Sequence, residues 1–379
     1  MKIGIDIKAF KNGTTGISRY LRSIMDRLQA LDTTNRYMLF ECTPSDYKVI
    51  NPRWQKVLLP WRLPGIFWQQ FILPQHLRRK GIDILWAPEQ ICPLWFNGVV
   101  FTTVYDLTVL RFPQTCQWSN RLIQRTLFPL TIKKSKYLLP ISDFIGRELR
   151  QFYPSLCAKT TITTIACGSP EWEFRHEVHT MPEPPVLFFA GNMEPRKNLG
   201  RLIEAMEILH REGMPVKLHL AGPPGWKNSD LHGKIATSPV RGSIHFLGYL
   251  SEGELKEQYR TCSAVVYPSL YEGFGLPLLE ALIMGARVVT SRGTVMEEIA
   301  GEAARYFDPF DAADLARVIR SLLDEPPPGE KEFLIYNQVL DKYSWEQSAR
   351  ELLRLFESQS RQSSIVPKTD SSDQQPNRT

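Results

Sequence analysis

The chain has 379 residues, of which 43% are hydrophobic, 11% aromatic and 23% charged. This composition is typical of soluble globular proteins and excludes the disordered, collagen-like and disulfide-scaffold classes. The length exceeds one ordinary core of about 100–150 residues, so we expect two domains and a tail. Because no apolar stretch of about 18 residues is free of charges, no transmembrane helix is expected.

Charge is distributed unevenly around a net value of +6. The first 170 residues hold 23 Lys and Arg against 10 Asp and Glu, whereas the remainder holds 23 against 30. A basic first half can attract nucleic acid, anionic lipid or a phosphorylated acceptor. No zinc-finger or RNP-type motif accompanies this charge, so we do not expect a nucleic-acid partner.

The six cysteines are scattered, without any C-x-x-C pair, which argues against a structural zinc site. Asp6 interrupts the start of the chain before an apolar run can form, so residues 1–10 do not resemble a secretory signal. Both features predict a reducing, cytoplasmic environment.

Strand-like and helical patterns alternate through the first half of the chain. A β-rich run at 2–7 leads into a loop at 11–16 and a helix at 17–31. Further strands are predicted at 37–41, 82–87, 99–105, 137–141 and 161–166. Such alternation indicates a parallel sheet with helices on both of its faces.

Residues 52–81 interleave aromatic and basic side chains, among them Trp54, Trp68, Phe71 and Arg78. Aromatic rings next to cations suit the headgroup layer of an anionic membrane, which would place the protein at the inner face of a membrane. The same pattern fits a core helix whose basic end complements the helix dipole. The sequence leaves both interpretations open.

Residues 171–185 are rich in Glu, His and Pro and are predicted to link two domains. A second α/β series follows, with strands expected at 186–190, 216–221, 243–247, 264–267 and 287–290. We therefore predict two doubly wound, Rossmann-like domains that face a cleft, with ligands at the carboxyl ends of their strands. The expected divisions are 1–170 for the acceptor side, 186–343 for the donor side, 344–357 for a helix crossing back, and 358–379 for a disordered tail.

Two adjacent cations, Arg196 and Lys197, follow the strand at 186–190 in a loop that begins at Gly191. Arginine offers a planar fork of donors and lysine a point charge, and together they suit a diphosphate. The helix predicted just after them adds backbone N–H donors. This combination of strand, cations and helix predicts a phosphate-binding loop.

Residues 267–281 form the most specific segment, a strand, a glycine loop and a helix. Gly273 and Gly275 allow the backbone to approach a ligand closely. Glu272 lies in the loop and Glu280 about one turn into the helix, so both carboxylates can accept hydrogen bonds from sugar hydroxyls in one cleft.

From residue 188 to 309 the chain closely resembles the retaining glycosyltransferases of family 4 (glycosyl transferases group 1), which have the two-domain GT-B fold and include mannosyltransferases. The resemblance rests on Glu194-Pro-Arg-Lys-Asn198, Ala221-Gly-Pro-Pro-Gly-Trp226, Phe246-Leu-Gly-Tyr249 and Tyr267-Pro-Ser-Leu-Tyr-Glu-Gly-Phe-Gly-Leu-Pro277. The first half is similar more loosely, at Gly16-Ile-Ser-Arg-Tyr20, Tyr105-Asp106-Leu107, Arg111-Phe-Pro113 and Ile141-Ser-Asp-Phe144.

This resemblance implies a role for each site residue. Arg196 and Lys197 would hold the diphosphate of a nucleotide-sugar, Glu272 would contact the donor sugar, and Glu280 would contact the ribose. Backbone amides would come from the loop at Gly273, Phe274, Gly275 and Leu276, and the loop from Gly13 to Gly16 would close from the other domain.

The chain departs from the family pattern at Tyr105 and at 291–298, where Ser-Arg-Gly-Thr-Val-Met-Glu-Glu stands in place of the commoner Ser-Leu-Pro-Glu ending. Tyr105 precedes Asp106 where relatives usually carry His-Asp-Leu, and a tyrosine is neutral and barely basic at pH 7. Tyr105 could donate a hydrogen bond to a sugar or phosphate oxygen, or it could be a packing residue in an impaired enzyme. The alternative function is therefore a nucleotide-sugar-binding scaffold or partner subunit.

The expected reaction moves a hexosyl unit, with retention of configuration, to a hydroxyl of a cell-surface glycan or a lipid-linked acceptor. The resemblance favours GDP-mannose as donor, with UDP-sugars close behind. No D-x-D-type motif lies in a suitable loop, so no metal or other cofactor is expected. Arg196, Lys197 and the loop amides would stabilise the leaving diphosphate.

Overall fold

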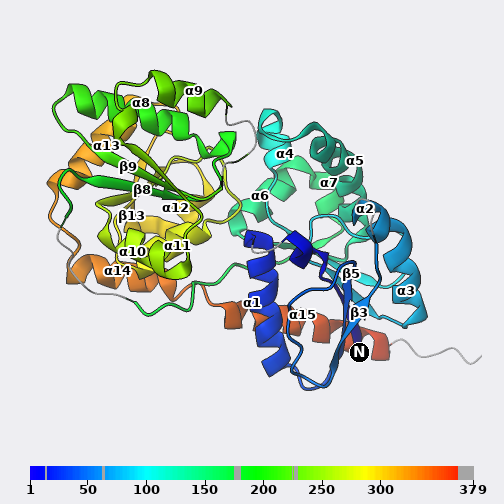
Figure 1. Cartoon of the computed structure of the whole chain (residues 1–379). Coiled ribbons are helices and arrows are strands. Elements are labelled where there is room, and N and C mark those ends of the chain that lie inside the picture. Colours follow the sequence, from blue (N-terminus) through cyan, green and yellow to red (C-terminus); the bar gives the residue numbers. More distant parts are fainter. Residues whose placement is uncertain (13–14, 62–64, 175–180, 224, 226–228, 366–379) are drawn as a thin grey trace, which may run out of the picture.

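The computed structural model describes residues 1–379 apart from 13–14, 62–64, 175–180, 224, 226–228 and 366–379. The described chain forms two α/β units, each with one parallel sheet, that lie side by side (Figure 1). This architecture confirms the predicted fold class.

The first sheet has the order β3-β2-β1-β4-β5-β6-β7, and all of its pairings are parallel. Its strands are β1 (Lys2–Asp6), β2 (Arg36–Glu41), β3 (Trp54–Leu58), β4 (Ile84–Ala87), β5 (Val99–Val104), β6 (Tyr137–Pro140) and β7 (Thr161–Ile162). The helices around it are α1 (Gly16–Leu31), α2 (Gly65–Phe67), α3 (Leu73–Arg79), α4 (Thr108–Arg111), α5 (Trp118–Lys134), α6 (Asp143–Phe152) and α7 (Pro154–Cys157), with short η1 (Lys8–Asn12), η2 (Trp68–Ile72) and η3 (Pro113–Thr115).

The second sheet has the order β10-β9-β8-β11-β12-β13 and is also parallel. Its strands are β8 (Val186–Ala190), β9 (Lys217–Ala221), β10 (Ile244–Gly248), β11 (Ala264–Tyr267), β12 (Val288–Ser291) and β13 (Ala304–Phe307). The associated helices are η4 (Pro195–Lys197), α8 (Leu199–Arg211), α9 (Ser229–Thr237), η5 (Arg241–Ser243), α10 (Glu252–Thr261), α11 (Leu276–Ile283), α12 (Val295–Ala300), η6 (Gly301–Ala303), α13 (Ala312–Asp324) and α14 (Glu330–Leu340); α15 (Trp345–Ile365) follows them in the chain.

Burial explains why the central strands were predictable. The residues of β4, β6, β11 and β12 are all buried, as continuous apolar runs in parallel sheets require. In both sheets the strand order reverses next to the first strand, between β1 and β4 and between β8 and β11. Ligands bind outside the carboxyl ends of strands at such reversals.

Two edge strands were not predicted from the sequence. β3 lies within the aromatic and basic segment, and β13 follows η6, and each pairs with a single neighbour. An edge strand can alternate buried and exposed residues, so it lacks the continuous apolar run that identified the others. The strand expected at 161–166 is also shorter, because β7 ends at Ile162.

The aromatic residues of 52–81 divide between core and surface. Trp54 and Trp68 are buried, which agrees with the core interpretation of this part of the segment. Phe67 and Phe71 are about half exposed. Of these four rings, only those of Phe67 and Phe71 are therefore available to a partner or a membrane.

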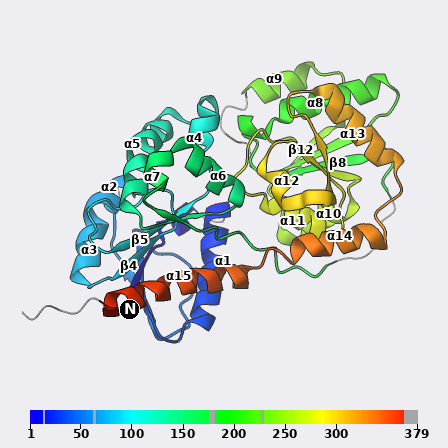
Figure 2. The same cartoon turned by 180° about the vertical axis from the view of Figure 1, so that it is seen from behind.

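The last helix returns from the second unit to the first. Figure 2 shows α15 leaving α14 and running along the first unit beside α1. Ser348 donates a hydrogen bond to the carbonyl of Ala166 (2.8 Å), and the Phe356 ring packs against Phe101. The helix continues to Ile365, past the expected end at 357, and within this continuation Gln359 is buried and donates a hydrogen bond to the Tyr137 hydroxyl.

None of the helices in the described ranges is both long enough and apolar enough to cross a bilayer. The predicted tail beyond Ile365 lies outside the described residues.

Candidate active site

A cavity of about 450 Å³ lies between the two units and is lined by loops from both. From the second unit come the loops that follow β8 and β11, which flank its strand-order reversal. The first unit contributes the loop after β5 and the start of α1. The structure thus places one cavity where both sheets end.

The structure brings together the predicted site residues that it describes. The lining includes Gly16, Tyr105, Asp106, Gly191, Arg196, Lys197, Glu272, Gly273, Phe274, Gly275, Leu276 and Glu280. Gly13, the remaining predicted residue, lies outside the described residues.

Glu272 bridges the two adjacent cations. Its Oε2 accepts a hydrogen bond from Arg196 Nη1 at 2.6 Å, and its Oε1 pairs with the Lys197 ammonium. Arg196 also donates through Nε to Glu194 at 3.0 Å. Because Arg196 and Lys197 follow β8 while Glu272 follows β11, these ion pairs join the two loops at the strand-order reversal.

The charges of this cluster stabilise one another against the cost of burial. Burial alone would raise the pKa of Glu272, but the charges of Arg196 and Lys197 outweigh it and lower that pKa to about 2. Burial also opposes the charge of Arg196, yet Glu272 and Glu194 raise its pKa above the ordinary value. At Lys197 burial dominates over the attraction of Glu272 and lowers the pKa. The Glu272 carboxylate is therefore ionised, and a poor proton acceptor, at neutral pH.

The second carboxylate, Glu280, is held from both units. Its Oε2 accepts a hydrogen bond from the Tyr259 hydroxyl at 3.0 Å, and its Oε1 pairs with Arg19 of α1. Arg19 was not among the predicted site residues. Arg19 lies three residues after Gly16, on the same face of a helix that begins at the cleft. This spacing could have indicated Arg19 as a site residue.

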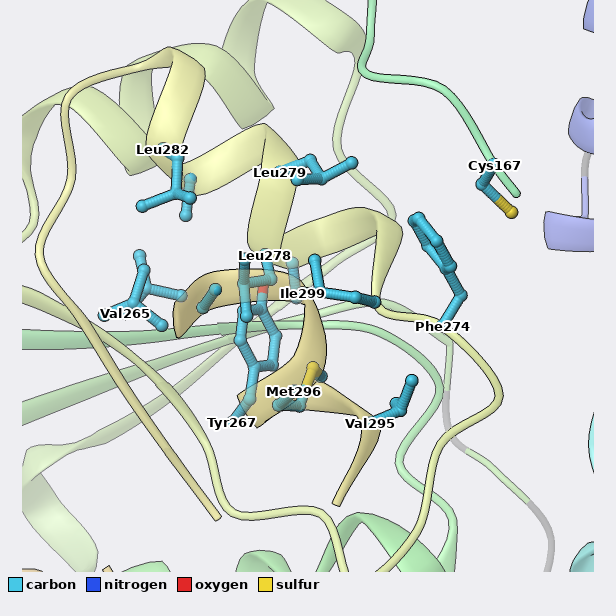
Figure 3. Packing of buried hydrophobic residues seen from close by; sticks show 14 of the residues in the cluster. Cys167, Val265, Tyr267, Phe274, Leu278, Leu279, Leu282, Val295, Met296 and Ile299 are labelled. Atoms are coloured by element: carbon cyan, nitrogen blue, oxygen red, sulfur yellow. The ribbon is translucent and has the colours of Figure 1, made fainter. Parts of the chain in front are cut away.

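Two glycines allow the loop after β11 to fit its surroundings. A Cβ atom on Gly273 would lie 1.9 Å from the carbonyl oxygen of Tyr105, so only glycine permits this approach of the two units. Gly275 has a φ of +131°, and a Cβ there would lie 2.6 Å from the sulfur of Met296. Figure 3 shows Met296 close to Tyr267 beneath the start of α11. The conformation of this loop therefore depends on contacts with Tyr105 of the first unit and with Met296 of the core.

Tyr105 is a neutral, enclosed side chain in this site. Its hydroxyl is buried and has no hydrogen-bond partner among the described residues, and its ring packs edge-on against Tyr20. Burial raises the pKa of the Tyr105 phenol well above its usual value. Tyr105 can therefore donate a hydrogen bond to a ligand, but it cannot act as a base at neutral pH.

A buried contact between the units, made by Tyr271, was not predicted. The Tyr271 hydroxyl donates to Glu148 of α6 and accepts a hydrogen bond from the backbone N–H of Leu107 at 2.9 Å. Glu148 is in turn paired with Arg111. Because Leu107 follows Asp106, this contact holds the loop after β5 next to Glu272. The partners are far apart in sequence, which left no local signal.

Comparison with known proteins identifies the class. Residues 170–338 match the family model described as "Glycosyl transferases group 1". This part of the chain is a domain of that family, and the two parallel sheets have the arrangement of the GT-B fold. The match confirms the predicted resemblance to glycosyl transferases group 1, while family 4 and retention of configuration stay predictions.

Curated relatives include mannosyltransferases of Escherichia coli. The chain is 28% identical over 354 residues to O-antigen chain mannosyltransferase B, an alignment that covers 86% of this chain and 91% of the relative. It is 32% identical over 273 residues to the serotype-specific mannosyltransferase WbdA, covering 66% of this chain but only 32% of that longer relative.

Solved structures share the fold at low sequence identity. A sucrose-phosphate synthase from Thermosynechococcus elongatus aligns over 96% of this chain and all of its own, with a TM-score of 0.75 and 17% identity. Anabaena HepE in complex with UDP-glucose aligns over 94% of this chain and all of its own, with a TM-score of 0.70 and 15% identity. At such identities these likenesses establish the fold alone.

The lowered pKa of Glu272 leads to a prediction about stability and pH. We expect Glu272→Gln to be less stable than the wild type, by an amount that is constant above pH 4.5, the ordinary pKa of the carboxyl. The difference should shrink as the pH falls from 4.5 toward 2, because protonation removes the ion pairs from the wild type.

Urea denaturation of both proteins across this pH range measures the difference. The exposed Glu346→Gln serves as the matched control and should differ little from the wild type at every pH. A Glu272 difference that does not change with pH would show that the ion pairs contribute nothing to folding.

Proposed function

We propose that this glycosyltransferase moves a hexosyl unit from a nucleotide-sugar to a hydroxyl of a cell-surface glycan or a lipid-linked acceptor, with retention of configuration, as family 4 enzymes do. The observation that carries the proposal is the pair of partly buried cations, Arg196 and Lys197, around Glu272 in a cavity lined by both units. A diphosphate is the ligand whose charge and two-centred geometry fit such a pair.

The chemistry follows from where charge develops. When the anomeric carbon–oxygen bond breaks, negative charge grows on the leaving diphosphate. Arg196 and Lys197 are positioned to stabilise it, and their partial burial strengthens the interaction compared with water. Because these two cations supply positive charge at the leaving group, the proposed reaction needs no metal ion.

The state of the carboxylates supports a front-face mechanism. Glu272 is engaged by two cations and Glu280 by Arg19 and Tyr259, so neither is poised as a covalent nucleophile. In the proposed step the acceptor oxygen bonds to the anomeric carbon on the face that the diphosphate leaves. The acceptor proton passes to a phosphate oxygen of the leaving group.

The mannosyltransferases among the relatives favour a mannosyl donor. We therefore propose GDP-mannose, with UDP-sugars as the second candidate class. The fold neighbour HepE, solved with UDP-glucose, is the reason to keep uridine donors in a test panel.

A second cavity, of about 640 Å³, adjoins the first and shares Tyr105, Asp106 and Arg196 with it. Most of its other lining residues belong to the first unit. We assign it to the acceptor and call it the acceptor cavity, because a group bound there would meet the donor at the shared residues.

The first prediction for the enzyme concerns Arg196. Arg196→Ala should lower kcat/KM for the donor by about tenfold or more, since each hydrogen bond to a charged group contributes roughly 1.5–3 kcal/mol. Transfer from a radiolabelled donor panel measures it. The exposed Arg350→Ala on α15 is the matched control. Undiminished turnover by Arg196→Ala would show that Arg196 does not bind the diphosphate of the donor.

Tyr105, whose hydroxyl has no partner among the described residues, stands where family members usually carry histidine, and this favours a second candidate function: a catalytically impaired scaffold that only binds nucleotide-sugars. A scaffold should bind donor, visible as a raised melting temperature, without hydrolysing or transferring it. We expect measurable transfer by the wild type. Binding without turnover in the wild type, together with turnover in Tyr105→His, would favour the scaffold instead.

An exposed patch on the first unit supports peripheral binding to an anionic membrane at the cytoplasmic face. Phe71, Arg78, Arg79 and Trp95 line one surface hollow, and Phe71 and Trp95 are 56% and 67% exposed. The neighbouring ring of Phe67 stacks on Phe71. Exposed rings beside cations can enter the headgroup layer of such a membrane.

Sedimentation with vesicles of anionic and of neutral lipid tests this surface. We expect binding to anionic vesicles that weakens in high salt and is reduced by Phe71→Ser, because that change removes an apolar contact. Phe310→Ser, which changes an exposed ring on the second unit, should not reduce it. Equal binding by all three proteins would contradict the assignment.

A further inference from the structure

The acceptor cavity shows which class of acceptor it can hold, an inference that rests on the proposed function. The cavity lies at the strand-order reversal of the first sheet, where the chain continues from β1 to Lys8 and from β4 to Glu89. Its uncharged polar lining consists mainly of side-chain amides and hydroxyls, those of Gln69, Gln90, Thr108, Thr115, Gln117, Asn120 and Gln124. These groups bind hydroxyls well, because each can donate or accept a hydrogen bond.

Both cations in the described lining are already occupied. The Lys8 ammonium lies 3.1 Å from Asp6 Oδ2 and 2.6 Å from Glu89 Oε2, and Arg196 is paired with Glu194 and Glu272. Carboxylates therefore match or outnumber the cations around this cavity. A phosphate group placed there would meet this negative charge, while of the two cations in the described lining Lys8 is held by two carboxylates and Arg196 is assigned to the donor diphosphate.

Several buried polar atoms around the cavity have no partner among the described residues. They are Tyr105 Oη, Thr108 Oγ1 and Gln124 Oε1, and Thr108 is only 8% exposed. Burying a polar group without a hydrogen bond is costly, so such groups indicate a missing ligand or water. Each sugar residue of a glycan carries several hydroxyls, and these can donate to or accept from the unpaired polar atoms.

Glu89 is the lining residue best placed to select such a ligand. Lys8 contacts its Oε2, which fixes the carboxylate and leaves Oε1 as the oxygen that can accept from a ligand. Lys8 is itself anchored by Asp6, and Asp6 accepts a further hydrogen bond from Gln69 (3.0 Å). A rigidly held carboxylate accepts hydrogen bonds from hydroxyls and repels anions.

We propose that the acceptor cavity binds the acceptor as an uncharged glycan end that presents hydroxyls, and that Glu89 is a specificity-determining residue that rejects a phosphorylated end. Any phosphate of a lipid-linked acceptor then lies outside the cavity. Glu89 acts by accepting a hydrogen bond from an acceptor hydroxyl while Lys8 holds it in place.

The test compares a neutral mannotriose with the same trisaccharide phosphorylated on its non-reducing residue, with the donor saturating. We expect the wild type to use the neutral acceptor with a kcat/KM about tenfold or more higher. Glu89→Gln should raise the KM for the acceptor by about tenfold, because it weakens the hydrogen bond from the acceptor hydroxyl. The KM for the donor should not change. Asn120→Lys, which adds a cation to the lining at an exposed position, should improve use of the phosphorylated acceptor.

The exposed Glu346→Gln is the control for removal of a negative charge. Equal or better use of the phosphorylated acceptor by the wild type would overturn the inference, and so would an unchanged acceptor KM in Glu89→Gln. Calorimetric binding of the neutral trisaccharide without donor gives a second readout. Glycan binding without any donor turnover would overturn the proposed function and support this inference. Donor turnover without binding or transfer to the neutral glycan would support the proposed function and overturn this inference.

Discussion

The carboxylate of Glu272 is the contact on which the donor site depends. A buried anion is stable only when paired, and Glu272 finds its partners, Arg196 and Lys197, in a loop from another strand. The pairing fixes two loops that are distant in sequence at one edge of the second sheet. It also positions the Arg196 and Lys197 side chains where a diphosphate can bind them together with Glu272 or in its place.

The first unit completes this site through contacts between backbone and buried side chains. Gly273 lies against the carbonyl of Tyr105, Tyr271 binds both Glu148 and Leu107, and Glu280 pairs with Arg19. These contacts set the loop after β5 beside the glycine loop. The two cavities consequently meet at a few shared residues, which is the geometry that the proposed direct transfer between two bound substrates requires.

Local patterns were sufficient to predict the central strands, the cation loop and the glycine loop, because a buried strand followed by a loop and a helix has a distinctive composition. Partners that depend on the tertiary fold were not predictable in the same way. Arg19 and Glu148 meet Glu280 and Tyr271 only after the two units pack together. The edge strand β3 was missed because of its polar residues, and α15 passes the expected end at 357, where Gln359 donates a hydrogen bond to Tyr137 of the first sheet.

The most direct test of the central claim is a crystal structure of the full chain with a bound nucleoside diphosphate. The account predicts phosphate oxygens within hydrogen-bond distance of Arg196 and Lys197, with the Glu272 carboxylate displaced from at least one of them. A diphosphate bound elsewhere, with both cations still paired to Glu272, would contradict it.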